Sequence, residues 1–262
     1  MTNPIKTKRN GAIFEITLDR PKANAIDQAT SRAMGDAFAE FRDDKDLRVA
    51  ILTGGGDKFF SAGWDLNEAA DAGGSGYSSD YGQGGLYGFP ELPRLEKPVI
   101  CAVNGYAIGA GFEVLLSADF VVAADNAQMW LPEAQLGVAP DVGTFRLPKI
   151  LPAVIANDIL YTGRRLSAED CQHWGLVNRV VPKEELMETA RELASEIVAS
   201  APLSVAAIKQ TIRLSRNMTM SQFYGAIRRG DFPLFTKMME SEDALEGPNA
   251  ALEKRDPVWK GK

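Results

Sequence analysis

The segment 98–116 (PVICAVNGYAIGAGFEVLL) constrains the fold most, because it combines a buried strand, a glycine-rich turn and an apolar helix in direct succession. Strands that read as short continuous apolar runs are typical of sheets covered on both faces. Residues 49–53 and 120–123 form runs of the same kind, separated by helical or glycine-rich stretches. We therefore predict an α/β fold with buried strands.

The flanking sequence adds further elements to this sheet. Residues 12–18 predict an opening strand that ends at a turn, and the apolar spacing after Asp27 predicts an amphipathic helix with Asp27 as its N-cap. Apolar residues at helical spacing after residue 186 indicate that the C-terminal quarter is helical. Residues 69–88 are polar and rich in glycine, so we expect a mobile loop there.

The glycine-rich turn at residues 109–111 has two interpretations. A dinucleotide-binding fingerprint needs a third glycine where Val114 stands, and its first glycine follows the strand too late. Alternatively, glycine lets a ligand approach the unpaired N–H groups at the start of a helix, where a developing oxyanion is stabilised. The missing third glycine makes the first interpretation weak.

Two glutamates stand among apolar residues and are candidates for acid and base work. Glu113 falls in the first turn of the helix expected after the glycines, where desolvation raises a carboxyl pKa into a useful range. Glu133 follows MWLP and precedes LGV after two further residues. For each residue taken alone there is an alternative: Glu113 complements the helix dipole, and Glu133 is an ordinary surface acid. Together they form a pair that shares acid and base roles if the fold brings them together.

The segment 61–66 (SAGWDL) is another small-residue turn after a strand. It offers a second backbone donor for the same oxyanion, and the alternative is a tight loop needed only to reverse the chain.

Composition excludes several classes of function. Lys and Arg number 29 against 35 Asp and Glu, a net charge of −6, so we expect no nucleic-acid partner. Glu113 and Asp119 interrupt the most apolar stretch, so we expect no membrane span. The N-terminal residues have no secretory pattern, and the two cysteines, Cys101 and Cys171, suit a reducing cytoplasm. A single histidine, His173, makes a metal site with several imidazoles impossible.

Motifs along nearly the whole chain resemble the enoyl-CoA hydratase/isomerase, or crotonase, superfamily. These motifs are RPKANAI at 20–26, SAGWDL at 61–66, NGYAIGAGFE at 104–113, LPEAQLGVAP at 131–140, TGRRLSAEDCQHWGLVN at 162–178 and SEDALEGPNAALEKRDP at 241–257. The resemblance implies an α/β spiral of ββα units in residues 1–195, with the CoA and active sites. It also implies a helical region in residues 196–262 that mediates a homotrimer or hexamer and contacts CoA.

The resemblance also implies the reaction, which is reversible hydration and dehydration of a short-chain acyl-CoA thioester. The family's two catalytic glutamates correspond to Glu113 and Glu133, and the backbone N–H groups of Trp64 and Ala110 form its oxyanion hole. No metal or separate cofactor is expected, because CoA enters as part of the substrate. A general enoyl-CoA hydratase and a non-catalytic acyl-CoA-binding protein stay open as alternatives.

Further site residues follow from the same resemblance. The CoA-binding candidates are Lys22, Ala23, Ala62, Asp65, Leu66 and Lys254. The acyl-pocket candidates are Trp130, Pro140, Asp141 and Tyr87. Two departures from the family pattern concern these sites: the segment 140–147 is one residue short, which reshapes the acyl pocket, and Ala251 replaces an aromatic residue near the CoA nucleotide.

A narrower resemblance lies in KFFSAGWDL at 58–66, RPKANAID at 20–27 and EKRDPVWKGK at 253–262. It is to family members that act on a trimethylammonium-bearing acyl group. Aromatic faces bind such a cation with about 2 kcal/mol when it is desolvated. The candidate rings are Trp64, Trp130, Tyr77, Tyr81 and Tyr87, and Asp80 and Asp141 are candidates for balancing its charge. The alternative is that these rings are core or loop anchors and that both carboxylates are merely solvated.

Overall fold

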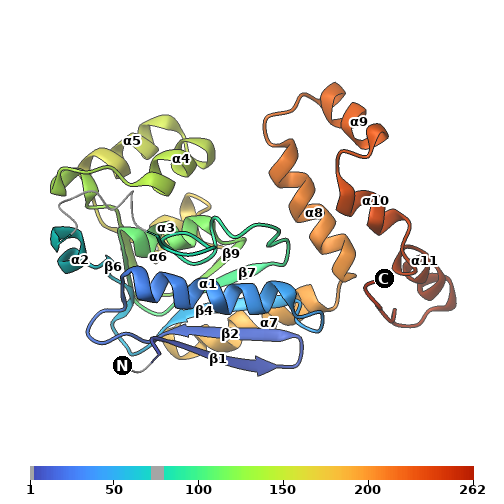
Figure 1. Ribbon diagram of the computed structural model, residues 1–262, viewed down its shortest axis with the longest axis horizontal. Helices are drawn as coiled ribbons and strands as arrows, with labels where there is room; N and C mark the ends of the chain where they lie inside the picture. The colour runs from blue at the N-terminus through green and yellow to red at the C-terminus, as the bar shows by residue number, and fades with distance from the viewer. Residues whose placement is uncertain (1–2, 72–79) are drawn as a thin grey trace.

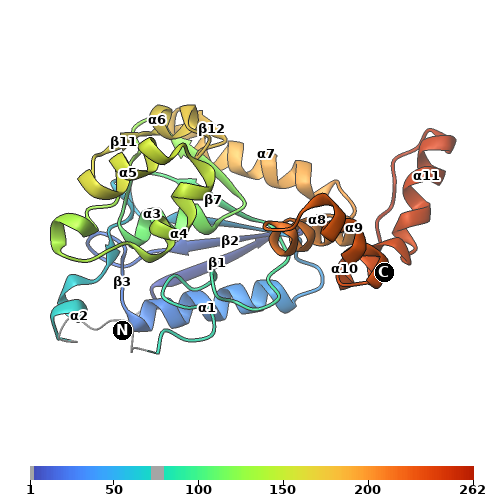
Figure 2. The same ribbon diagram turned by 90° about the horizontal axis from the view of Figure 1, so that it is seen from above.

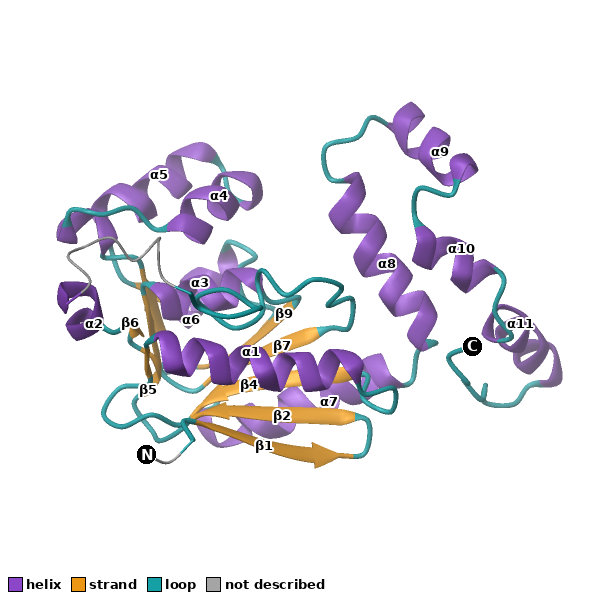
Figure 3. Cartoon of the chain, in the orientation of Figure 1, coloured by secondary structure: helices purple, strands orange, loops and turns teal. Residues whose placement is uncertain are grey.

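The computed structural model describes residues 3–71 and 80–262, and within them three β-sheets are surrounded by helices (Figures 1 and 3). The largest sheet has the order β1-β2-β4-β7-β9-β12, and its strands are parallel except for the β1–β2 hairpin. Its members are β1 (Ile5–Asn10), β2 (Ile13–Leu18), β4 (Val49–Gly54), β7 (Val99–Val103), β9 (Phe120–Ala124) and β12 (Arg179–Val181).

Two smaller sheets lie beside the end of this one. The first has the order β11-β10-β8-β5, and the second pairs β3 with β6. Their strands are β3 (Ala25–Ile26), β5 (Phe59–Ser61), β6 (Gly63–Trp64), β8 (Tyr106–Ile108), β10 (Gln128–Trp130) and β11 (Leu166–Ser167). Each long strand β4, β7 and β9 therefore leads into a short strand of the second sheet, and a helical element follows. This repeat is the spiral of ββα units that the resemblance implied.

The helices after these strands complete the fold. Within the described residues they are α1 (Gln28–Asp43), α2 (Leu66–Asp71), α3 (Ala110–Ser117), η2 (Glu133–Leu136), α4 (Asp141–Ile150), α5 (Ala153–Thr162), α6 (Ala168–His173), η3 (Lys183–Glu185), α7 (Leu186–Val198), α8 (Pro202–Ser215), α9 (Met220–Arg229), α10 (Pro233–Met239) and α11 (Asp243–Glu253). The predicted N-cap of the first helix is confirmed, since Asp27 accepts a hydrogen bond from the N–H of Thr30 at 2.7 Å.

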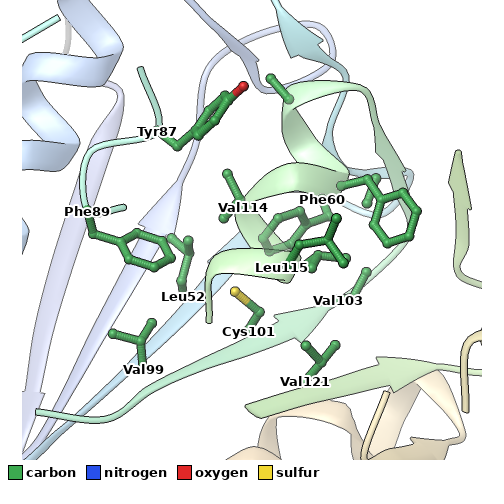
Figure 4. Packing of buried hydrophobic residues seen from close by; sticks show 14 of the residues in the cluster. Leu52, Phe60, Tyr87, Phe89, Val99, Cys101, Val103, Val114, Leu115 and Val121 are labelled. Carbon is green, nitrogen blue, oxygen red and sulfur yellow. The ribbon is translucent and has the colours of Figure 1, made fainter. Parts of the chain in front are cut away.

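The apolar strands form cores on both faces of the large sheet because successive side chains point to opposite faces. In β7, Val99, Cys101 and Val103 face the core that contains α1 and α3, as Figure 4 shows for that cluster. Ile100 and Ala102 face the opposite core, which α7 covers. Burial on both faces explains why the strands read as continuous apolar runs. The α/β prediction is confirmed.

The C-terminal helices α8–α11 stand to one side of the sheets (Figures 1 and 2). Polar contacts connect them to the core: Lys209 donates to Asp119 at 2.7 Å, and Arg213 pairs with Glu96. Helix α7 runs across the expected boundary at residue 195, and the division into a core and a C-terminal region stays a prediction.

The expected loop at residues 69–88 is partly wrong. Residues 69–71 continue helix α2, whose first turn is supported by the Asp65 carboxylate accepting from the N–H of Asn67 at 3.0 Å. Residues 80–88 contain neither helix nor strand, and the rest of the segment, with Tyr77, lies outside the described residues.

Candidate active site

Helix α3 places Glu113 next to the start of its own helix. Gly109 precedes the helix with a φ of 54°, a conformation that favours glycine, and its N–H donates to the carbonyl of Trp130 at 2.9 Å. Glu113 is only 2% exposed. Its Oε1 accepts from the N–H of Gly143 at 2.8 Å, and its Oε2 contacts the hydroxyl of Tyr87. Both oxygens of this buried carboxyl are therefore held.

The burial of Glu113 changes its acidity. Desolvation raises the pKa of Glu113 to about 8, with the negative charge of Asp141 as the next cause. The hydrogen bonds from Gly143 and Tyr87 oppose this rise because they stabilise the carboxylate. A carboxyl with such a pKa exchanges protons readily near neutral pH.

Glu133 begins η2 directly beyond β10, which runs parallel to β8. This pairing brings Glu133 against the N-terminus of α3: a Cβ on Gly109 would lie 2.8 Å from Oε1 of Glu133. Oε2 of Glu133 is buried and has no hydrogen-bond partner among the described residues. Burial raises the pKa of Glu133 to about 7, and the charge of Asp141 adds to the rise.

The structure brings the two glutamates together. The charge of Glu133 raises the pKa of Glu113, and both carboxyls flank the start of α3. Two carboxyls with neighbouring pKa values and one proton between them can serve as an acid and a base on a single substrate. The catalytic roles of Glu113 and Glu133 stay predictions, and their placement meets the geometric requirement.

The expected oxyanion-hole residues also lie side by side. Ala110 is the first residue of α3, so its N–H belongs to the amides that have no partner within the helix. A Cβ on Gly63 would lie 2.9 Å from the N of Ala110 and 2.5 Å from the carbonyl oxygen of Ile108. Gly63, with a φ of 85°, thus lets β6 and Trp64 approach the start of α3 closely.

Five of the CoA-binding candidates gather around the β3–β6 pair. Ala62 donates its N–H to the carbonyl of Ala23 at 2.9 Å, which joins two candidates directly. Asp65 accepts from Arg20 at 2.8 Å, and Leu66 is 64% exposed at the start of α2. Lys22 adjoins Ala23 in the turn before β3.

Lys254 does not join this group. It follows α11, at the end of the molecule opposite to α2 in Figures 1 and 2. Within one chain α8–α11 extend away from the spiral core, and the role of Lys254 in CoA binding stays a prediction.

The acyl-pocket candidates divide into two groups. Tyr87 and Asp141 lie beside Glu113: the hydroxyl of Tyr87 is 3.1 Å from Oδ1 of Asp141. Pro140 is buried immediately before α4, whose first turn supplies the N–H that binds Glu113. Trp130 differs, because the guanidinium of Arg165 lies 4.5 Å from the centre of its ring.

These contacts narrow the set of rings for a substrate cation. Trp130 already holds a cation, so it is a poor cage residue. Asp80 is paired with Arg32 at 3.0 Å, which leaves Asp141 as the better of the two carboxylate candidates. The ring of Trp64 is half-buried, and its Nε1 has no hydrogen-bond partner among the described residues.

Sequence reasoning missed two contacts of this site. The first is the N–H of Gly143, which no side-chain pattern reveals because a backbone amide carries no sequence signature. The second is the direct contact between Tyr87 and Glu113, which joins residues 26 positions apart. Within residues 3–71 and 80–262, no three His, Cys, Asp or Glu side chains form a group that suits a metal ion.

Comparison with known proteins defines the class. The enoyl-CoA hydratase/isomerase family model matches residues 8–262, so the chain belongs to this family. The solved enoyl-CoA hydratases from Mycobacterium tuberculosis H37Rv and Mycobacterium marinum superpose with TM-scores of 0.89 and 0.88, at 36% and 38% identity, and each comparison covers 100% of both chains.

Curated relatives are more similar still. The carnitinyl-CoA dehydratase of Salmonella typhimurium is 57% identical to this chain over 263 residues, which cover 100% of both proteins. The protein of the same name from Salmonella heidelberg has the same identity and coverage.

Proposed function

We propose that this chain is a hydro-lyase that adds water reversibly across the Cα–Cβ double bond of a 2-enoyl-CoA, with crotonobetainyl-CoA and carnitinyl-CoA as its preferred pair. The observation that carries the proposal is the convergence of the buried carboxyl of Glu113 and the half-buried carboxyl of Glu133, each with a pKa raised to near neutrality, on the open amides at the start of α3. The 57% identity to carnitinyl-CoA dehydratases supports the choice of acyl group.

In this mechanism, the amides of Trp64 and Ala110 donate to the thioester oxygen and stabilise the enolate charge that develops there. During hydration, one carboxylate of the pair takes a proton from water as its oxygen bonds to Cβ. The protonated carboxyl delivers its proton to Cα. Dehydration reverses both transfers, so the pair holds one proton before and after the reaction.

Substrate choice is tested by the loss of the conjugated enoyl-thioester absorbance when the purified protein is mixed with crotonobetainyl-CoA or with crotonyl-CoA. We expect a larger kcat/KM for crotonobetainyl-CoA. Equal or larger values for crotonyl-CoA would instead support a general enoyl-CoA hydratase, which the resemblance to solved enoyl-CoA hydratases also favours. No loss of absorbance with either thioester would indicate a binding protein.

Gly63→Ala is expected to lower kcat by about a hundredfold or more, because its Cβ would push β6 away from the amide of Ala110. The matched control is Gly56→Ala: Gly56 has a similar φ of 77° but nothing within 4 Å of the added Cβ. Both variants carry the same kind of backbone strain, so only Gly63→Ala should lose activity beyond its loss of thermal stability. Equal kcat values in the two variants would contradict this account of the hole.

The pH dependence follows from the raised pKa values of about 8 for Glu113 and about 7 for Glu133. Below about pH 7 both carboxyls hold protons and no base is present, and above about pH 8 both are ionised and no acid is present. We therefore expect a bell-shaped profile of kcat/KM with its maximum between these values. Activity that stays constant down to about pH 5 would show ordinary carboxyl pKa values and contradict the prediction.

The assembly is proposed to be a homotrimer or a hexamer. Exposed apolar side chains on the C-terminal helices support it; they are Ile208, Ile212, Met220, Tyr224 and Leu252. Light scattering should give three or six times the chain mass of 28.4 kDa.

A cytoplasmic location is proposed as well, supported by the free, buried thiols of Cys101 and Cys171. The described part of the chain has no helix with the length and apolar character needed to cross a membrane.

A further inference from the structure

Tyr87 connects the catalytic pair to a third carboxylate. Its side chain is 4% exposed and lies at the edge of the core beside Val114 (Figure 4). The hydroxyl oxygen contacts Oε2 of Glu113 on one side and lies 3.1 Å from Oδ1 of Asp141 on the other. Asp141 begins α4 and is exposed. A single phenol therefore bridges a buried carboxyl and a carboxylate at the surface.

The number of protons decides how this bridge works. Burial and the two neighbouring acids raise the pKa of Tyr87 above its ordinary value, so the phenol keeps its proton at every working pH. A phenol has one proton to donate, and its oxygen also accepts. When Glu113 is ionised, the hydroxyl donates to Oε2. When Glu113 is protonated, its own O–H donates to the phenol oxygen, and the phenol proton is free to turn toward Asp141.

We propose that Tyr87 is a positioning residue of the reaction, whose single hydroxyl proton turns between Glu113 and Asp141 so that Glu113 keeps a hydrogen-bond partner with and without its proton. The inference rests on the proposed function, because Tyr87 acts only through Glu113. No proton leaves the phenol in either state, and the only covalent changes are those at Glu113 itself. Asp141 is required because its carboxylate accepts the hydrogen bond from the phenol in one of the two states.

The surroundings of Glu113 give this bridge a distinctive signature. The charged groups that act on Glu113 are Asp141 on α4 and Glu133 on η2, and both raise its pKa. The hydrogen bond from Tyr87 lowers the pKa of Glu113 alone, whereas Asp141 raises the pKa of both glutamates. Removing the hydroxyl of Tyr87 must therefore raise the pKa of Glu113, and removing the carboxylate of Asp141 must lower it.

The first test is a titration that does not depend on activity. Protein labelled with ¹³C at the glutamate carboxyl carbons is titrated by NMR, and the signals are assigned by their loss in Glu113→Gln and Glu133→Gln. We expect Tyr87→Phe to raise the pKa of Glu113 by about one unit and to leave the pKa of Glu133 unchanged. Asp141→Asn should lower the pKa values of both glutamates. Tyr161→Phe, which removes the hydroxyl of an exposed tyrosine on α5, should move neither.

The second test is kinetic. Tyr87→Phe should lower kcat about tenfold with KM within about twofold, the loss expected for one hydrogen bond to a charged group. Asp141→Asn should slow the wild-type enzyme more than it slows Tyr87→Phe, because part of the effect of Asp141 passes through the phenol.

The inference is overturned if Tyr87→Phe leaves the titration of Glu113 unchanged, or if the kcat losses of the two variants multiply. Lack of hydratase activity in the wild type would overturn the proposed function, and the titration would still decide whether Tyr87 and Asp141 control the proton on Glu113. If Tyr87→Phe does not fold, the Asp141→Asn variant decides the matter by itself. An unchanged pKa of Glu113 in that variant overturns the inference.

Discussion

Glu113→Gln is expected to lower the turnover of crotonobetainyl-CoA by at least about a hundredfold, because the amide can neither take up a proton nor give one up in the reaction. The fold should survive the change. The amide oxygen can still accept from the N–H of Gly143, and the amide nitrogen can donate to the phenol oxygen of Tyr87.

The stability of this variant is predictable from the pKa of about 8, since at pH 7 the carboxyl of Glu113 is already largely protonated and neutral. A neutral amide therefore replaces a nearly neutral acid. We expect a thermal midpoint within a few degrees of the wild type. Glu40→Gln, at an exposed position on α1, is the control for the loss of a carboxyl elsewhere. A Glu113→Gln variant that keeps more than about a tenth of the wild-type rate would remove Glu113 from the mechanism.

Glu133→Gln is expected to produce a loss of the same size for a different reason. Oε2 of Glu133 is buried and has no hydrogen-bond partner in the part of the chain that the structure describes, so it is the oxygen that is open to a bound substrate. The amide cannot exchange a proton with the substrate through this atom. The substitution replaces one unpartnered buried atom with another, and its effect on folding should accordingly be small.

Measurements on Glu133→Gln separate chemistry from binding. We expect kcat to fall by at least about a hundredfold while KM changes little, because the thioester is held mainly by the backbone amides. A variant with normal kcat and a raised KM would assign Glu133 to substrate binding and leave Glu113 as the sole carboxyl in the reaction.

The fold was predictable because its signals are local. The apolar runs that form β4, β7 and β9 are covered on both faces, and the cap formed by Asp27 lies three residues from the amide that it binds. The prediction of a loop at residues 69–71 rests on composition alone. The structure extends α2 through these residues, and the Asp65 carboxylate supports the first turn of that helix.

The site was predictable only in part. Glu113 and Glu133 were predictable as candidates because apolar residues flank both of them in the sequence. The parallel pairing of β8 with β10 then brings the two side chains close together. The partners of Glu113 come from segments distant in sequence, since Tyr87 lies in a stretch without regular structure and Gly143 donates through its backbone. The distance of Lys254 from the other CoA-binding candidates was not predictable, because a motif match carries no information about where α11 lies relative to the core.

The central claim is that the two carboxyls act as one unit on a single thioester. It is tested most directly by comparing Glu113→Gln, Glu133→Gln and the double variant in the loss of enoyl-thioester absorbance from crotonobetainyl-CoA. Residues that act as a unit are strongly non-additive, so the double variant should react within about tenfold of the slower single variant. Losses that multiply to about ten-thousandfold or more would show two independent contributions and contradict the claim.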